Sequence, residues 1–357
     1  MAAASRRRVT IKHVAREALV STQTVSRVIN ERPDVAPETR QRVLDVIERL
    51  GYKPSALARS LIRQRSHTLG VVTAGLQYMG PSRTLNGITA KAEELGYTLL
   101  LEELADFAYG DVQPILDNLL ARQVDGIIWA VQEAGDNREV FASVLSEFPV
   151  PIVFLTMHEM PGWHIVNFDN YVGGRLATEH LLAHGHRHIG HITGPLSWWE
   201  ARERRRGWEE ALAEVGIVVT DQHCVQGNWS SARGEQAVAR LYQQFPQMTA
   251  VFVANDQMAL GVLNYAHRHG IRVPQDLAVV GFDGLPEAAY FWPPLTTIYH
   301  NQNELGCNAV TQIADLVETA AGEEMPPPRV VWLQPELVVR ESSGGTPVQP
   351  MVTPGGV

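Results

Sequence analysis

The stretch TIKHVAREALVSTQTVSRVIN, residues 10–30, contains two short helical patterns separated by a break at LVS. Apolar side chains recur at helical spacing on both sides of the break. They are Ile11, Val14, Ala15 and Ala18, followed by Val25, Val28 and Ile29. Thr10 and Ser21 precede the two patterns, where a hydroxyl oxygen can accept hydrogen bonds from first-turn amides. Two short helices joined by a tight turn indicate a helix-turn-helix unit.

A third helical pattern begins at Pro37, a residue suited to the first position of a helix. Its apolar positions Val43, Ile47 and Leu50 can share one small core with the first two helices. The polar side chains of the second helix then face outward: Thr22, Gln23, Ser26 and Arg27, with Asn30 at its end. Such residues reach base edges in the major groove, where glutamine can bind adenine and arginine can bind guanine or a phosphate. A solvated face on an ordinary three-helix bundle is the alternative.

The charge of the chain is divided unevenly. Residues 1–66 carry a net charge of +8 and the remaining residues carry −17, which together give −9. A basic head on an acidic body indicates a phosphate-binding module attached to a part that does not touch nucleic acid. The length of 357 residues predicts two or three domains.

Cysteine usage and hydropathy indicate the compartment. Cys224 and Cys307 are far apart and form no spacing motif, which fits a reducing environment. The N-terminal residues lack the apolar run of a secretory signal, and no apolar stretch is long enough to span a bilayer. The sequence therefore favours a cytoplasmic protein.

The stretch PSALARSLIRQRS, residues 54–66, contains a short helical pattern with Ala58 and Leu61 on one face. Three arginines surround this apolar pair, and the stretch contains no acidic residue. A helix this short is marginal in water without a partner. We therefore expect the segment to become helical only where something packs against the apolar pair.

From Thr68 onward, apolar strand-like runs alternate with helical stretches. This alternation predicts an α/β fold with parallel sheets that are covered by helices on both faces. Ligands of such sheets bind beyond the carboxyl ends of the strands. The polar residues just after strands are therefore candidates: Thr156, Asp169, Asn255, Asp256 and Asp283. Asn255 and Asp256 can instead simply cap the helix that follows them.

Several motifs resemble the lac/galactose repressor family in their order and spacing. They are VTIKHVAREALVSTQTVSRVIN, VAPETRQRV, LGYKPSALARSL, GPLSWWEARERRRGW, GNWSSARG and VANDQMALGVL. The resemblance covers about residues 9–340 and implies a helix-turn-helix domain at 1–53 and a hinge helix at 54–66. It also implies a two-lobed core at 67–340 that is similar to periplasmic sugar-binding proteins.

The expected lobes are discontinuous in sequence. The first is placed at about 67–166 and 300–327, and the second at about 167–298 and 328–340. Residues 341–357 are rich in glycine and proline and are expected to form a disordered tail.

In this family the hinge helix folds when two subunits pair on DNA, and a leucine from each subunit enters the minor groove. Leu61 matches this leucine and Ala58 matches the pairing face. Two positions depart from the family pattern. Leu19 stands at a turn position usually held by glycine, so a non-glycine residue needs a positive φ there. Ala36 stands where a hydroxyl cap is usual.

The resemblance further implies an effector site between the lobes. The residues that match position by position are Arg204, Trp229, Asn255, Asp283 and Phe168. Each suits a sugar, because an indole face stacks on a pyranose ring and the polar groups can pair with hydroxyls. Thr156, His300 and Ala130 depart from the family pattern, standing in place of an aspartate, a glutamine and an asparagine. Thr156 and His300 remain candidate contacts, and the particular sugar is open.

The sequence therefore favours a sugar-responsive, DNA-binding transcriptional repressor without a cofactor. A homodimer is expected on a near-palindromic operator, because the tail lacks the leucine heptads that would make a tetramer. A regulator that needs a corepressor, such as a purine, is the main alternative. A sugar-transport protein is disfavoured by the basic head, and an enzyme by the lack of a dinucleotide fingerprint or nucleophile motif.

Four histidines lie close together in the sequence, namely His184, His186, His188 and His191. They span a helix end, a glycine turn and a strand start, so their rings are not expected to converge on a metal.

Overall fold

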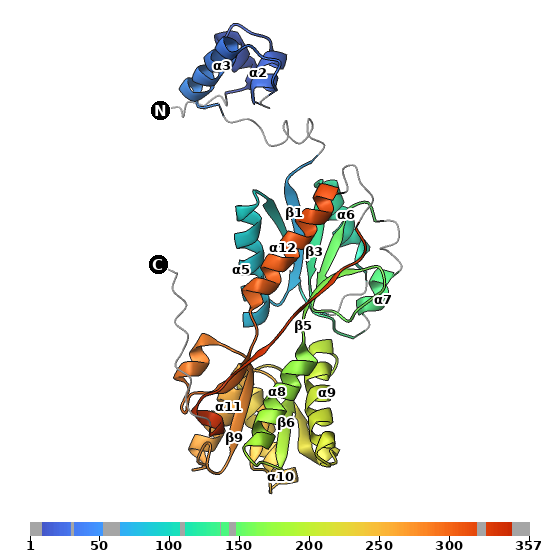
Figure 1. The fold of residues 1–357 in the computed structure, drawn as a ribbon, viewed down its shortest axis with the longest axis vertical. Coiled ribbons are helices and arrows are strands. Elements are labelled where there is room, and N and C mark those ends of the chain that lie inside the picture. Colours follow the sequence, from blue (N-terminus) through green and yellow to red (C-terminus); the bar gives the residue numbers. More distant parts are fainter. Residues whose placement is uncertain are drawn as a thin grey trace, which may run out of the picture. The chain divides into compact units, whose positions relative to one another are not determined.

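The computed structural model describes residues 9–29, 32–52, 65–107, 111–135, 137–142, 148–319 and 326–344. The chain divides into two compact units, Met1–His67 and Thr68–Val357 (Figure 1). Three candidate DNA contacts, Asn30, Ala58 and Leu61, lie outside the described residues, together with most of the expected hinge helix.

The first unit contains three helices: α1 (Ile11–Glu17), α2 (Thr22–Ile29) and α3 (Pro37–Leu50). Their apolar faces meet in one core, which confirms the predicted helix-turn-helix arrangement. The buried members of this core are Val14, Ala15, Ala18, Val25, Val28, Val43, Val46 and Tyr52.

The turn between α1 and α2 contains a leucine in the left-handed region, as its position in the sequence predicts. Leu19 has a φ of 54° and its side chain is 87% exposed. The turn is closed by a hydrogen bond of 3.0 Å from the Val20 amide to the Ala15 carbonyl. The Ser21 hydroxyl accepts from the Thr24 amide at 3.0 Å, which confirms Ser21 as the cap of α2. Ala36 precedes α3 without a side-chain cap, also as expected.

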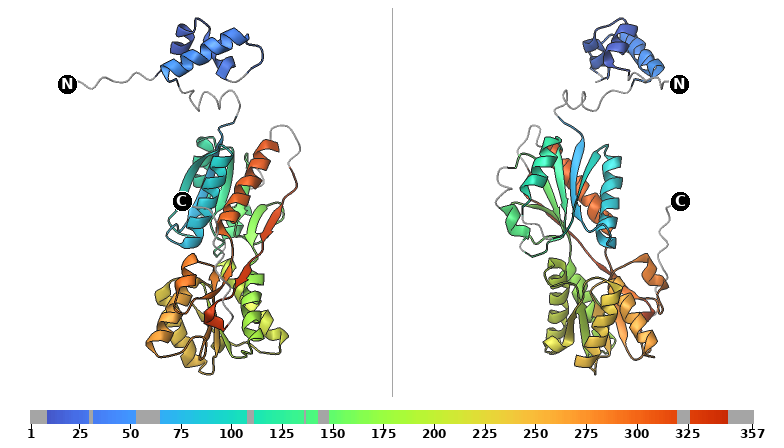
Figure 2. Two further views of the ribbon diagram at one scale, coloured as in Figure 1. Left: turned by 60° about the vertical axis from the view of Figure 1, so that its left-hand side comes forward. Right: turned by 180° about the vertical axis from the view of Figure 1, so that it is seen from behind.

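The second unit contains two six-stranded sheets, each with its own covering helices (Figure 2). In the first sheet the strand order is β11-β5-β4-β3-β1-β2, and every neighbouring pair is parallel. The strands are β1 (Thr68–Ala74), β2 (Thr98–Leu104), β3 (Gly126–Ala130), β4 (Ile152–Leu155), β5 (His164–Phe168) and β11 (Val330–Leu333). Helices α5 (Met79–Glu94) and α12 (Gln302–Thr319) share one core with this sheet, and α6 (Gln113–Ala121) and α7 (Asn137–Ala142) contribute to another. We call this sheet and its helices the first lobe.

The second sheet has the strand order β12-β10-β9-β8-β6-β7. Its strands are β6 (Ile189–Thr193), β7 (Cys224–Gln226), β8 (Ala250–Val253), β9 (Ala278–Asp283), β10 (Thr296–Tyr299) and β12 (Glu336–Val338), of which only β12 pairs antiparallel within the described sheet. Helices α8 (Asn170–Ala183) and α9 (Trp199–Glu214) pack in one core of this second lobe, and α10 (Ser231–Gln244) and α11 (Asp256–Arg268) pack in the other. Because both faces are covered, β6 and β8 are buried along their whole length.

The chain passes between the lobes after β5, between β10 and α12, and between β11 and β12. Two expected boundaries are corrected by this topology. β5 belongs to the first sheet through Phe168, and β11 pairs with β5 although residues 328–340 were assigned to the second lobe. The reason is that β11 completes the edge of a parallel sheet through pairing with a strand about 165 residues earlier, which no local pattern reveals.

The disordered tail expected at residues 341–357 does not begin at residue 341. Residues Glu341–Ser343 form a short 3-10 helix in which Ser342 and Ser343 are buried. The Ser342 hydroxyl donates to the Val279 carbonyl at 2.6 Å, and the Thr296 amide donates to the same hydroxyl oxygen at 2.8 Å. These bonds hold residues 341–344 against β9 and β10, so the prediction of disorder is wrong for them. Residues 345–357 lie outside the described part of the chain.

The described helices include none that is long and apolar enough to cross a membrane. The described residues also contain no group of three or more histidine, cysteine, aspartate or glutamate side chains placed to hold a metal ion. Of the four neighbouring histidines, His191 is buried in β6, where its ring stacks on Phe252 with centroids 4.6 Å apart.

His191 makes stability depend on pH. Burial lowers the pKa of His191 to about 3, against the opposing effect of a hydrogen bond to the Phe252 carbonyl. The unfolded chain therefore takes up a proton as the pH falls through about 6.5, while the folded chain does not, and stability is lost. The buried carboxyl of Asp256 has a pKa raised by burial to about 8, which acts in the opposite direction, so the test must compare variants.

Lowering the pH from 7 to 5 should cost the unchanged protein about 2 kcal/mol more unfolding free energy than it costs His191→Phe, which has no imidazole at this position. Urea unfolding followed by circular dichroism at the two pH values measures this difference. An equal pH dependence in both proteins would contradict it.

Candidate nucleic-acid interface and ligand site

The surface of α2 presents the polar side chains that the sequence predicts. Thr22, Gln23 and Arg27 are exposed, Ser26 is partly buried, and the apolar residues between them face the core. The Arg27 guanidinium is 51% exposed and lies 3.3 Å from the Asp34 carboxylate. An exposed ion pair of this kind contributes little and gives way to a stronger anion such as a phosphate.

Not every arginine of the first unit is free to bind DNA. The Arg42 Nε donates to the Ala18 carbonyl at 3.1 Å and so joins α3 to the end of α1. Arg49 pairs with Glu17 at 3.2 Å and joins the same two helices. These two arginines join helices within the unit, and the exposed polar face of α2 is the candidate interface.

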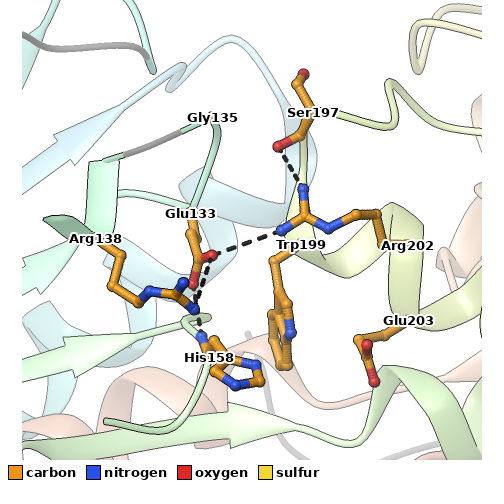
Figure 3. Close-up of a pocket in the computed structure, with 8 residues that line it drawn as sticks. All are labelled: Glu133, Gly135, Arg138, His158, Ser197, Trp199, Arg202 and Glu203. Carbon is orange, nitrogen blue, oxygen red and sulfur yellow. Dashed lines mark hydrogen bonds and ion pairs between the residues drawn. The ribbon is translucent and has the colours of Figure 1, made fainter.

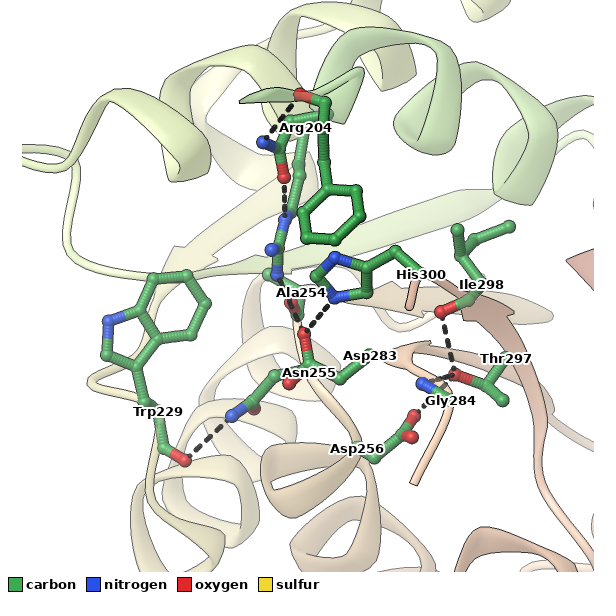
Figure 4. A network of polar contacts seen from close by, with 12 residues as sticks. Arg204, Trp229, Ala254, Asn255, Asp256, Asp283, Gly284, Thr297, Ile298 and His300 are labelled. Carbon is green, nitrogen blue, oxygen red and sulfur yellow. Dashed lines mark hydrogen bonds and ion pairs between the residues drawn. The ribbon is translucent and has the colours of Figure 1, made fainter. Parts of the chain in front are cut away.

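In the second unit, Arg204 lies at the centre of a buried polar network (Figure 4). Its Nε donates to Asn170 Oδ1 at 2.8 Å, and its Nη1 donates to the Ala254 carbonyl at 2.5 Å. The same Nη1 lies 3.5 Å from Asp283 Oδ1, and the guanidinium stacks 3.7 Å from the Phe282 ring centroid. Burial lowers the pKa of Arg204, and Asp283 opposes this effect.

The backbone places Arg204 close to α8. A Cβ on Gly174 would lie 2.2 Å from the Arg204 carbonyl oxygen, so only glycine allows α8 and α9 to approach this closely. Asn170, at the start of α8, is thereby brought within hydrogen-bond distance of the guanidinium.

Asp283 and His300 form the second part of the network. Asp283 ends β9 with a φ of 105°, and His300 follows β10 on a segment that passes between the lobes. His300 Nε2 lies 3.1 Å from Asp283 Oδ1 and donates to it. Burial lowers the pKa of His300, while the neighbouring Asp283 raises it. The ring of Phe168 meets His300 edge-on with centroids 4.3 Å apart, so a side chain of the first lobe reaches the network.

Trp229 and Asn255 form its outer edge. Asn255 caps α11 by accepting from the Met258 amide at 3.0 Å, and its Nδ2 donates to the Trp229 carbonyl at 3.0 Å and to Gln257 at 2.7 Å. The asparagine therefore caps the helix and also fixes the loop that carries the indole. A Cβ on Gly194 would lie 2.0 Å from the Trp229 ring, so the ring lies directly on the backbone there.

Six of the seven candidates are thus joined by the network, while Thr156 is not. Thr156 follows β4 with a φ of 53°, and its carbonyl accepts from the Glu133 amide at 3.3 Å. Among the described residues its buried hydroxyl has no hydrogen-bond partner, and no ion pair or hydrogen bond links it to Arg204 or Asp283. Its role as a ligand contact stays a prediction. Ala130, at the end of β3, is buried.

The sequence interpretation missed Glu200, which lies one turn before Arg204 on α9 and is half-buried. Burial raises the pKa of Glu200 to about 7; the charge of Arg204 lowers it and that of Asp283 raises it. The i, i+4 spacing to Arg204 could have identified this carboxylate. Asp256, by contrast, is structural, because its oxygens accept from Thr297 Oγ1 at 2.6 Å and from the Leu285 amide at 2.7 Å.

The comparisons with known proteins agree with both units. Residues 10–55 match the family model described as bacterial regulatory proteins, lacI family, and residues 178–343 match the periplasmic binding protein-like domain. The HTH-type transcriptional repressor PurR of Pasteurella multocida is 32% identical over 93% of this chain and 98% of its own length. Catabolite control protein A of Priestia megaterium is 34% identical over 85% of this chain and 90% of its own length.

Solved structures give the same assignment. The lac repressor dimer bound to operator and the anti-inducer ONPF has a TM-score of 0.83 at 32% identity and covers 94% of this chain and 99% of its own. The complex of the transcriptional regulator CelR with cellobiose has a TM-score of 0.69 at 29% identity and covers 94% of this chain and 100% of its own. The identities do not single out the lac repressor among these proteins, and the relatives are transcriptional regulators and not enzymes. The chain belongs to the lacI family of bacterial regulatory proteins and is a DNA-binding transcriptional repressor.

Proposed function

We propose that this repressor responds to a small sugar bound at the network of Arg204, Asp283 and His300, and that the sugar lowers operator affinity. The observation that carries the proposal is the position of this network at the carboxyl ends of the second sheet's strands, with an indole beside it. Ligands of parallel sheets bind at that edge.

The chemistry of the site suits an uncharged polyol. Asp283 presents a carboxylate that Arg204 and His300 already orient, and its remaining lone pairs can accept from sugar hydroxyls. Glu200 supplies a second acceptor on the adjacent turn of α9. A site built on such groups rejects a ligand without the matching hydroxyls, because buried polar groups would be left unpaired. The cellobiose bound by CelR shows that a relative takes a saccharide.

The sugar can change operator affinity if it binds one arrangement of the two lobes more tightly than another. A ligand that contacts Phe168 of the first lobe and Asp283 of the second favours arrangements in which the two are close. In the proposed mechanism, the homodimer presents two α2 helices to a near-palindromic operator, and the change in lobe arrangement reaches the DNA through the segment at residues 54–66. Thr22, Gln23, Ser26 and Arg27 are the proposed DNA contacts from α2.

A thermal-shift screen against mono- and disaccharides tests the ligand site. A sugar present at 100 times its Kd adds about 2.7 kcal/mol to the stability of the folded state, which shifts Tm by several degrees. We expect at least one sugar to give this shift. The same screen includes purine bases, and a shift with a purine and with no sugar would favour the corepressor alternative and contradict the proposal.

A further inference from the structure

Residues of both lobes line a cavity of about 490 Å³, and none of them belongs to the Arg204 network (Figure 3). The first lobe contributes side chains that follow β3 and β4, and the second contributes the first turns of α9. The lining residues are Glu133, Gly135, Arg138, His158, Ser197, Trp199, Arg202 and Glu203.

A buried carboxylate lies at the centre of this cavity wall. Glu133 is only 3% exposed, and its Oε2 accepts from the His158 amide at 2.8 Å. Its Oε1 lies 3.9 Å from Arg138 Nη1 of the first lobe and 3.6 Å from Arg202 Nη2 of the second. Glu133 therefore separates two guanidinium groups that come from opposite lobes. We call Glu133, Arg138 and Arg202 the inter-lobe charge cluster.

The arginine of the second lobe is held toward this carboxylate. Arg202 Nη1 donates to the carbonyls of Ser197 at 2.9 Å and Leu196 at 3.2 Å, so the side chain is anchored to the loop before α9. Its remaining terminal nitrogen is the one that faces Glu133. Because the donor is anchored in its own lobe, movement of the lobes changes its distance to Glu133.

Main-chain contacts join the lobes at the same place. The Trp199 amide donates to the Glu133 carbonyl at 3.0 Å, and the Gly135 amide donates to the Ser197 carbonyl at 2.9 Å. Beside them, the Trp198 ring packs on Phe107 of the first lobe, with centroids 4.4 Å apart, and meets Trp229 of the effector site at 5.6 Å. The cluster thus lies on a contact between lobes that continues to the effector site.

The negative charge of Glu133 determines whether the inter-lobe charge cluster attracts the two lobes to each other. With Glu133 ionised, each partly exposed guanidinium faces a buried carboxylate, and its charge interaction is stronger there than between two groups in water. Without it, two positive groups on different lobes face each other, and a buried charge left without its partner is unfavourable. Removing the charge of Glu133 therefore takes away an attraction between the lobes and leaves a repulsion that favours their separation.

We propose that Glu133 is a positioning residue for effector binding, which holds the two lobes in the arrangement that assembles the effector site by linking Arg202 of the second lobe to the first. The proposal rests on the effector site described above. The proposed effector contacts groups of both lobes, and Glu133 also contacts both lobes. Effector binding and the Glu133–Arg202 contact therefore stabilise the same lobe arrangement, and each makes the other more favourable.

The test uses three variants of the full chain. Glu133→Gln keeps the shape and removes the charge, and Arg202→Met breaks the link between lobes. Arg138→Met is the matched control, because it removes an arginine that pairs with the same carboxylate from within the first lobe. Thermal unfolding verifies that each variant folds. Since Arg202 is 42% exposed, its variant carries the test if Glu133→Gln does not fold.

The first measurement needs no ligand. Spin labels at the exposed positions Glu93 of α5 and Gln243 of α10, with Cys224 and Cys307 replaced by serine, report the distance between the lobes by double electron–electron resonance. We expect a longer and broader distance distribution for Glu133→Gln and Arg202→Met, and an unchanged one for Arg138→Met. Unchanged distributions in the first two variants, or an equal change in all three, would overturn the proposal.

The second measurement is the affinity for the sugar found by thermal shift. Glu133→Gln and Arg202→Met should each raise its Kd about tenfold, and the double variant should raise it no further than Glu133→Gln alone. Altered distances with unaltered Kd values would refute the link to effector binding. Altered distances with no sugar found would leave the link between the lobes standing while the proposed function fails, so the two failures are distinguishable.

Discussion

We expect Asp283→Ala to abolish the response of operator binding to the proposed effector and to leave operator affinity in its absence unchanged within about twofold. Asp283 is the group that Arg204 and His300 both orient, and in the proposed function it is the acceptor that the sugar hydroxyls would lose. The loss of two hydrogen bonds to a charged group corresponds to about 3 kcal/mol, or at least 100-fold in effector affinity. Isothermal titration with the sugar and fluorescence anisotropy with labelled operator measure the two quantities.

Operator binding should survive in this variant because Asp283 lies in the unit Thr68–Val357, whereas α2 folds on the separate core of the first unit. The matched control is Asp276→Ala, which removes an exposed carboxylate of the same lobe that pairs with Arg272. This control should keep the full response. If Asp283→Ala loses operator binding as well, Asp283 is a structural residue and not a ligand contact.

The second large effect is expected at the DNA surface. Arg27→Ala should weaken binding to the specific operator by about 1–3 kcal/mol, which is roughly 5- to 150-fold. Arg27 is exposed on α2, and its pairing with Asp34 is the kind of surface ion pair that a DNA contact replaces. If Arg27 binds a base, the loss is confined to the specific sequence; if it binds a phosphate, specific and scrambled DNA lose affinity alike and the salt dependence becomes weaker. Anisotropy titrations with both DNAs at several salt concentrations separate the two cases.

Asp34→Ala is the control for this experiment. It removes the partner of Arg27 without removing the guanidinium, so operator affinity should be kept or slightly increased. Equal weakening by Arg27→Ala and Asp34→Ala would mean that the ion pair itself shapes the first unit and that Arg27 makes no DNA contact.

Much of the fold could be predicted because local patterns determine it. The apolar spacing of α1, α2 and α3 and the cap at Ser21 identify the first unit before any tertiary contact is considered. Strand and helix alternation identifies the two sheets. The places where the prediction is wrong depend on distant partners: β11 needs β5, and the buried serines 342 and 343 need β9 and β10. A short apolar run and a polar, glycine-rich end do not show those partners.

The residues of the candidate site likewise divide into those that the sequence predicts and those that depend on contacts between distant parts of the chain. Asp283 was predicted from its position after a strand as well as from the family resemblance, whereas Arg204, His300, Phe168 and Trp229 came from the resemblance alone. The network joins all five. Glu200 could have been predicted from its spacing to Arg204. Glu133 could not, because its importance arises from Arg202, which the fold brings across from the other lobe.

The most direct test of the account is the operator affinity of the dimer with and without the sugar that gives the largest thermal shift. At a saturating sugar concentration, we predict that the Kd for the operator rises at least tenfold, and that the Kd of Asp283→Ala does not change. An operator Kd that is the same with and without a bound sugar would contradict the proposal that a ligand bound at the Arg204 network controls DNA binding.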